Sequence, residues 1–88
     1  MEQRSIDELV DEATATVVAI SSGLAILRRR ALRYQDWVTA HSPIDDGWCR
    51  RVQELARSCR EIKRLERNLT LSVRILDQRR QRQEERCV

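Results

Sequence analysis

The sequence predicts an all-α protein whose architecture is a long antiparallel αα-hairpin, expected to form a homodimeric four-helix bundle. The composition favours helices, because 41% of the 88 residues are hydrophobic and 35% are charged, with only one proline, two glycines and no phenylalanine. Two long runs of apolar residues repeat at spacings of three and four, with one short break between them. We expect residues 1–88 to form a single domain. A chain this short has a small core, so we expect a partner chain to add stability.

The first helix is predicted over residues 5–41. Ser5 followed by Glu8 matches a capping box, and further acidic residues follow in the first turns, where the helix dipole favours negative charge. Ten residues then continue a ladder at spacings of four and three, which places them on one stripe: Ile6, Val10, Ala13, Val17, Ile20, Leu24, Leu27, Ala31, Tyr34 and Val38. Gly23 beside this stripe is expected to let another backbone approach closely.

The second helix is predicted over about residues 43–85, directly after a short turn. Ser42 fits an N-cap, Pro43 the first helical position and Asp45 the third position. Since short connections favour antiparallel neighbours, the two helices should form a hairpin. His41, at the turn, is interpreted as the C-terminal residue of the first helix.

The second helix has its own ladder: Trp48, Val52, Leu55, Cys59, Ile62, Glu66, Leu69, Val73 and Leu76. Cys59 is interpreted as a small buried hydrophobe. Glu66 interrupts the ladder, with Leu65 beside it; the glutamate either fixes the register of the seam or extends to its edge. Residues 79–88 lack apolar periodicity, so we expect this tail to fray or to continue as an unsupported helix.

Basic residues line the face of the second helix opposite its ladder. At 100° per residue, Arg57, Arg60, Arg64 and Arg67 fall together, and we name these four the arginine row. The predicted binding residues are this row with its neighbours: Arg50, Arg57, Arg60, Lys63, Arg64, Arg67 and Arg74. Residues 47–82 contain eleven Lys and Arg against four acids, whereas residues 1–27 contain five acids against one Arg. Arginine suits bidentate phosphate binding, so the row favours nucleic acid.

A solvated outer surface is the alternative, because any soluble helix has a charged face, and Glu61 has the spacing to pair with Arg57 or Arg64. Leu71 and Ile75 on the same face favour a contact instead. The three aromatic residues lie outside the row, which argues against stacking on single-stranded bases, and no helix-turn-helix pattern is present. A long helix that contacts backbone across successive grooves suits duplex RNA, which is bound chiefly by shape.

The second helix also resembles the small suppressors of RNA silencing from nodaviruses. The resemblance covers roughly residues 34–76 and includes the pair Arg50 and Arg51, then Cys59, then Lys63 and Arg64, with the tripeptide "YQD" before the turn. It implies an antiparallel homodimer that binds double-stranded RNA without reading its sequence. Such binding would shield long duplexes from Dicer and sequester small interfering RNA. An arginine of that family falls on Leu69, so Arg67 or Arg74 would take its role.

Other functions are disfavoured by the residue types present. One His at a turn, no Gly-rich phosphate loop and no paired carboxylates predict no enzyme and no cofactor, and the spacing of the three cysteines predicts neither a zinc site nor a disulfide framework. No apolar run approaches about 18 residues, so we expect no membrane association. The expected location is the cytoplasm of a host cell, with duplex RNA, a second copy and host silencing proteins as partners. The alternative function is a structural coiled-coil or helical-bundle subunit that binds no RNA.

Overall fold

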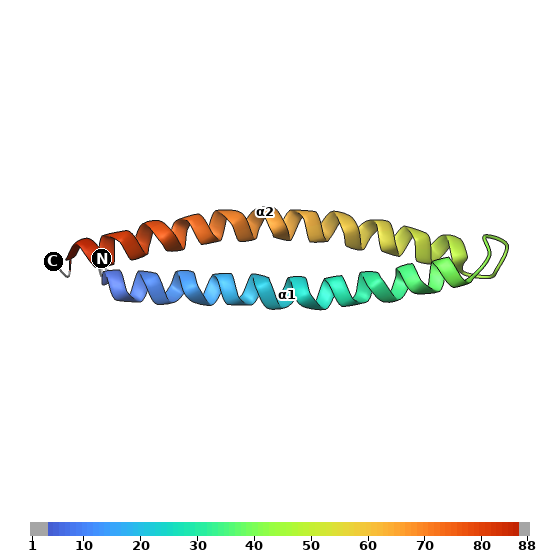
Figure 1. The fold of residues 1–88 in the computed structure, drawn as a ribbon, viewed down its shortest axis with the longest axis horizontal. Coiled ribbons are helices and arrows are strands. Elements are labelled where there is room, and N and C mark those ends of the chain that lie inside the picture. Colours follow the sequence, from blue (N-terminus) through green and yellow to red (C-terminus); the bar gives the residue numbers. More distant parts are fainter. Residues whose placement is uncertain (1–3, 87–88) are drawn as a thin grey trace.

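The computed structural model describes residues 4–86, which form two long helices packed side by side (Figure 1). Helix α1 runs from Ile6 to Ala40 and helix α2 from Trp48 to Arg86. The helices run antiparallel, so the start of α1 and the end of α2 lie at one end of the molecule and the loop closes the other end (Figure 1). The molecule measures 65 × 26 × 14 Å. The predicted all-α hairpin is confirmed.

Helix α1 begins where its capping signal predicts. The Ser5 hydroxyl oxygen accepts a hydrogen bond from the Glu8 backbone N–H at 3.2 Å, and the Leu9 N–H donates to the Ser5 carbonyl. Because the first N–H groups of a helix lack partners within it, this cap stabilises the first turn. At the other end His41 is the C-cap residue. Its ring stacks on Trp37, with the ring centroids 3.9 Å apart.

Helix α2 begins at Trp48, so the predicted start near residue 43 is wrong. The expected capping contacts do form, since the Asp45 carboxylate accepts from the Ser42 N–H at 2.8 Å and the Asp45 N–H donates to the Ser42 carbonyl. They close only a single turn, because Gly47 has φ +80° and so turns the chain out of the right-handed helical conformation. The Trp48 indole then donates to the Val38 carbonyl at 3.2 Å, which ties the start of α2 to the end of α1.

The seam of α1 is confirmed at all ten predicted positions, each of which is buried or half-buried. Leu24 is the most enclosed, with 1% of its surface exposed. Gly23 needs no close approach within the hairpin, since a Cβ built there would meet nothing within 4 Å. The described core is small, because the buried hydrophobic residues are only Val10, Ala13, Leu24 and Leu76.

The seam of α2 differs from the prediction at Cys59, Glu66 and Val73, which are exposed. The other six predicted positions are at least half-buried as expected: Trp48, Val52, Leu55, Ile62, Leu69 and Leu76. Cys59, however, is exposed, and Ser58 beside it is buried; likewise Ser72 is half-buried whereas Val73 is exposed. The interpretation of Cys59 as a buried hydrophobe is therefore wrong. A small serine at these positions lets α1 approach more closely than a larger side chain would.

Glu66 lies beside the seam, and Leu65 takes the seam position. The exposed Glu66 carboxylate meets Arg28 of α1 at 3.5 Å, which agrees with a glutamate that extends to the seam edge.

The tail continues as a helix to Arg86, so of the two expectations for residues 79–88 the helical one is confirmed for residues 79–86 and fraying is wrong there. Arg79 donates from its guanidinium to the Leu9 carbonyl at 2.8 Å, and the Gln83 amide donates to the Asp7 carboxylate at 2.7 Å. These two residues continue the seam with polar contacts to α1. The sequence reasoning missed them because it searched for apolar periodicity alone. Residues 87–88 lie outside the described range.

By length and composition, one helix in the described range qualifies as a candidate membrane span. The best 18-residue window of α1 has a mean hydropathy of 1.4, and 17% of that window is buried in the hairpin. This corrects the expectation that no segment approaches a membrane span. Core helices of soluble proteins and signal sequences meet the same criterion. Because so little of this window is buried, much of the apolar surface of α1 is left uncovered by α2.

Candidate nucleic-acid interface

The structure places all seven predicted binding residues on α2 and leaves each of them exposed. The arginine row, residues 57, 60, 64 and 67, follows spacings of three and four, so its side chains occupy neighbouring positions on one helical face. The row spans about 15 Å of helix, and Arg74 extends it to about 26 Å from Arg57. Because α2 is continuous here, its backbone holds the guanidinium groups at fixed intervals.

No ion pair occupies the arginine row. Within residues 4–86 the structure has two ion pairs, Arg4 with Glu12 and Arg28 with Glu66, and neither involves the row. The pairs of Glu61 with Arg57 or Arg64, which the solvated-surface alternative allows, do not form. Arg57 does share a shallow pocket of about 200 Å³ with Glu54 and Glu61. The positive charge along the rest of the row is therefore available to an external anion.

The two basic residues at the start of α2 have different surroundings. Arg50 is exposed. Arg51 is half-buried, and its guanidinium carbon lies 4.2 Å from the centroid of a Trp37 ring, within the range of a cation–π contact. Arg51 therefore contributes to the closed end of the hairpin, whereas Arg50 is accessible to a ligand.

Four arginines of α1 lie in the half of the molecule that contains the loop and the start of α2. They were not among the binding residues predicted from the sequence. They are Arg28, Arg29, Arg30 and Arg33, all exposed. The antiparallel arrangement brings them level with the row, as the pocket shared by Arg30 and Arg57 shows. Residues 28–64 thus contain ten basic and five acidic residues. The charge-count signal was present in the sequence, but only the hairpin register shows that the two clusters share one half of the molecule.

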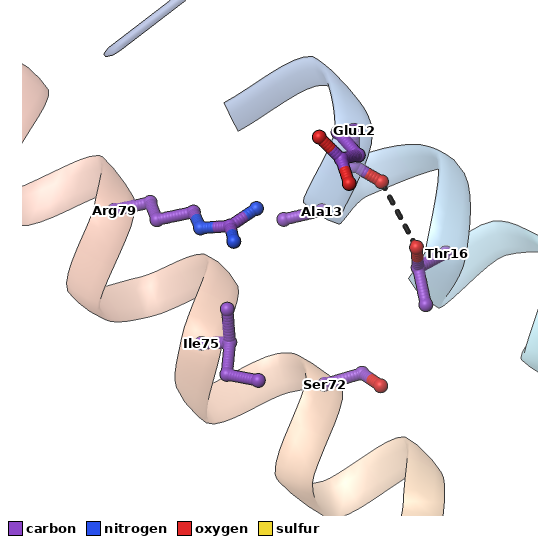
Figure 2. A pocket seen from close by; sticks show the side chains of 6 residues that line it. All are labelled: Glu12, Ala13, Thr16, Ser72, Ile75 and Arg79. Carbon is purple, nitrogen blue, oxygen red and sulfur yellow. Dashed lines mark hydrogen bonds between the residues drawn. The ribbon is translucent and has the colours of Figure 1, made fainter. Parts of the chain in front are cut away.

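Two large apolar residues interrupt the basic face, as predicted. Leu71 is 54% exposed and Ile75 is 45% exposed. Ile75 also lines a notch of about 120 Å³ between the helices, together with Glu12, Ala13, Thr16, Ser72 and Arg79 (Figure 2). The small side chains of Ala13 and Ser72 both line this notch. Its polar lining includes one carboxylate and one guanidinium, and the Thr16 hydroxyl donates to the Glu12 carbonyl.

Within residues 4–86, no three His, Cys, Asp or Glu side chains lie close enough to hold a metal ion. The fold and the site therefore define an all-α hairpin with an exposed basic helical face. Comparison with protein family models, curated proteins and solved structures finds no match to this chain.

Proposed function

We propose that this chain binds double-stranded RNA through the arginine row, without reading its sequence. The observation that supports the proposal best is the row itself: four exposed guanidinium groups on one rigid helical face, none in an ion pair within the described residues. Phosphates attract such a row whatever the bases are, and a straight helix is suited to contacts across successive grooves of an RNA duplex. Arg50, Lys63 and Arg74 extend the contact at its ends and edge.

The biological role that we propose is suppression of RNA silencing by a viral protein in the host cytoplasm. Its support is the resemblance of residues 34–76 to the nodavirus suppressors, together with the basic face. A protein that covers a duplex would block its cleavage by Dicer and would sequester small interfering RNA. Because binding of this kind needs neither a reaction centre nor a cofactor, the proposed mechanism is occupancy of the RNA.

A gel-shift titration tests the binding proposal. We would compare an RNA duplex of about 20 base pairs, the same sequence as a DNA duplex, and single-stranded RNA. The expected result is preference for the RNA duplex, with similar affinity for unrelated duplex sequences. The double variant Arg60→Glu/Arg64→Glu should lose binding and keep its helical circular dichroism, because both side chains are exposed.

The matched control is a single charge reversal on each helix. Arg64→Glu should weaken binding strongly, whereas Arg33→Glu, an equal charge change on an exposed site of α1, should weaken it much less. Equal losses for the two variants would show that net charge, not the row, governs binding. No binding by the wild-type protein to any of the three nucleic acids would favour the alternative, a structural subunit of a protein complex.

A further inference from the structure

The side of α1 that points away from α2 is exposed and has a composition of its own. Ser22 lies about 180° around the helix from the buried Ala13, because an α-helix turns by about 100° per residue. Residues at spacings of four, seven or eleven from Ser22 share its side of the helix. Six exposed residues follow these spacings, and we name them the outer face of α1: Ala15, Val18, Ser22, Ile26, Arg29 and Arg33. Val18 and Ile26 are its large apolar side chains, 57% and 56% exposed.

Charge is distributed unevenly along α1. Residues 13–27 contain no charged residue, and residues 13–35 contain four arginines and no acid. The uncharged stretch is about 22 Å long by helical rise. Four of the five acids of α1 precede it. Neither Arg29 nor Arg33 forms an ion pair within residues 4–86. The outer face therefore joins apolar surface to positive charge that is available to an external anion.

This combination suits the surface of a membrane that contains anionic lipid. Apolar side chains of an interfacial helix enter the boundary between headgroups and acyl chains, and arginines beside them extend to the phosphates. The best 18-residue window of α1 has a mean hydropathy of 1.4, and little of it is buried in the hairpin. Protein partners of an apolar face are most often anchored by aromatic side chains, and the outer face contains none.

The hairpin favours contact with the membrane surface over a membrane-spanning α1. Helix α2 lies along the full length of α1 (Figure 1). A spanning α1 would either carry the charged side chains of α2 into the hydrocarbon or lose its packing against α2, and both are costly. Lying on the surface leaves the seam between the helices intact.

We propose that the outer face of α1 docks on the surface of an anionic membrane. Val18 and Ile26 enter the headgroup boundary, and Arg29 and Arg33 bind lipid phosphates. The arginine row belongs to the other helix, so it remains accessible while α1 is on the membrane. The docking does not depend on RNA binding, and no readout below involves RNA.

Vesicle flotation tests the apolar contact. The wild-type chain should float with vesicles of phosphatidylcholine and phosphatidylserine, and much less with phosphatidylcholine alone. Ile26→Glu should weaken this binding by about tenfold. The matched control Leu71→Glu makes the same charge change at an apolar residue of α2 that is 54% exposed, and it should bind nearly as the wild type does. A wild-type chain that does not float, or equal affinities of the two variants, would overturn the proposal.

Charge removal tests the arginine contact separately. Arg29→Gln/Arg33→Gln should weaken binding to the anionic vesicles by about thirtyfold, because each arginine at the surface contributes about fivefold. Arg80→Gln/Arg82→Gln removes the same charge from exposed sites of α2 and should have little effect. Equal weakening by the two double variants would mean that net charge alone attracts the chain to the vesicles. That result would overturn the assignment, as would no weakening by Arg29→Gln/Arg33→Gln.

A fluorescent label reports which side of the hairpin meets the lipid. In a background with the three cysteines changed to serine, an environment-sensitive dye on Ser22→Cys should shift to shorter wavelength when anionic vesicles are added. The same dye on Gln78→Cys, an exposed site on the side of α2 away from α1, should not shift. A shift at both sites or at neither would overturn the proposal. A shift of the dye at residue 22 without vesicles, together with self-association, would overturn it in favour of a second copy.

Discussion

The salt dependence of RNA binding gives a quantitative test of the arginine row. If the four guanidinium groups each neutralise one phosphate, they contribute about −3.6 per chain to the slope of the logarithm of the association constant against the logarithm of salt concentration. Between about 50 and 200 mM salt, this contribution alone lowers affinity about 150-fold. The Arg64→Gln variant removes one contact, so the contribution of the row should become about −2.7, which corresponds to a loss of about 40-fold.

The assay is fluorescence anisotropy with a labelled RNA duplex over a series of salt concentrations, with Arg33→Gln as the matched variant. Arg33 is also exposed, but it lies on α1, so its removal should leave the slope close to the wild-type value. A slope for Arg64→Gln equal to that of the wild type would mean that Arg64 does not release a counterion on binding. An equal reduction by Arg33→Gln would mean that the contact is not confined to the row. Either result would refute the assignment of the row as the site.

Three further predictions concern the hairpin. Leu24→Ala should lower the free energy of unfolding by about 3 kcal/mol in urea denaturation, whereas the exposed Leu71→Ala should change it little. Gly47→Ala should destabilise the protein by about 1 kcal/mol, because Gly47 has a left-handed φ angle. Gly23→Ala should stabilise it by up to about 1 kcal/mol, because Gly23 lies within a helix with open space around it. Thermal melts of both variants would check the contrast. Cys59 should react with a thiol reagent in the folded protein as readily as in urea, and protection in the folded state would contradict its exposure.

Local signals in the sequence were sufficient for α1 and for the fold class. The N-cap at Ser5 and the ten-residue ladder depend on spacing and capping chemistry, and both are intrinsic to one helix. The start of α2 was not predictable in the same way, because Ser42 and Asp45 make capping contacts whether or not a helix follows. The backbone conformation of Gly47 determines where α2 begins, and the sequence alone does not reveal the sign of a glycine φ angle.

The exposed state of the arginine row followed from periodicity, but the neighbourhood of the row did not. The row lies level with Arg30 of α1 only because of the register between the two helices. Interhelical contacts such as that of Trp48 with Val38 determine this register. Arg79 and Gln83 were missed for a related reason. Their contacts are hydrogen bonds to α1, and a search for apolar repeats does not detect polar side chains that complete a seam.

The misassigned positions of α2 have a physical explanation in the width of its apolar face. Cys59 and Val73 are apolar and keep heptad spacing with Val52, yet Ser58 and Ser72 occupy the seam in their place. Packing against α1 alone needs only one of these two series, either Ser58 and Ser72 or Cys59 and Val73. A helix in a four-helix bundle packs against two neighbours, so its apolar face is wider than one seam. The second series, with Cys59 and Val73 exposed, is therefore apolar surface that a further helix packed beside α2 would cover.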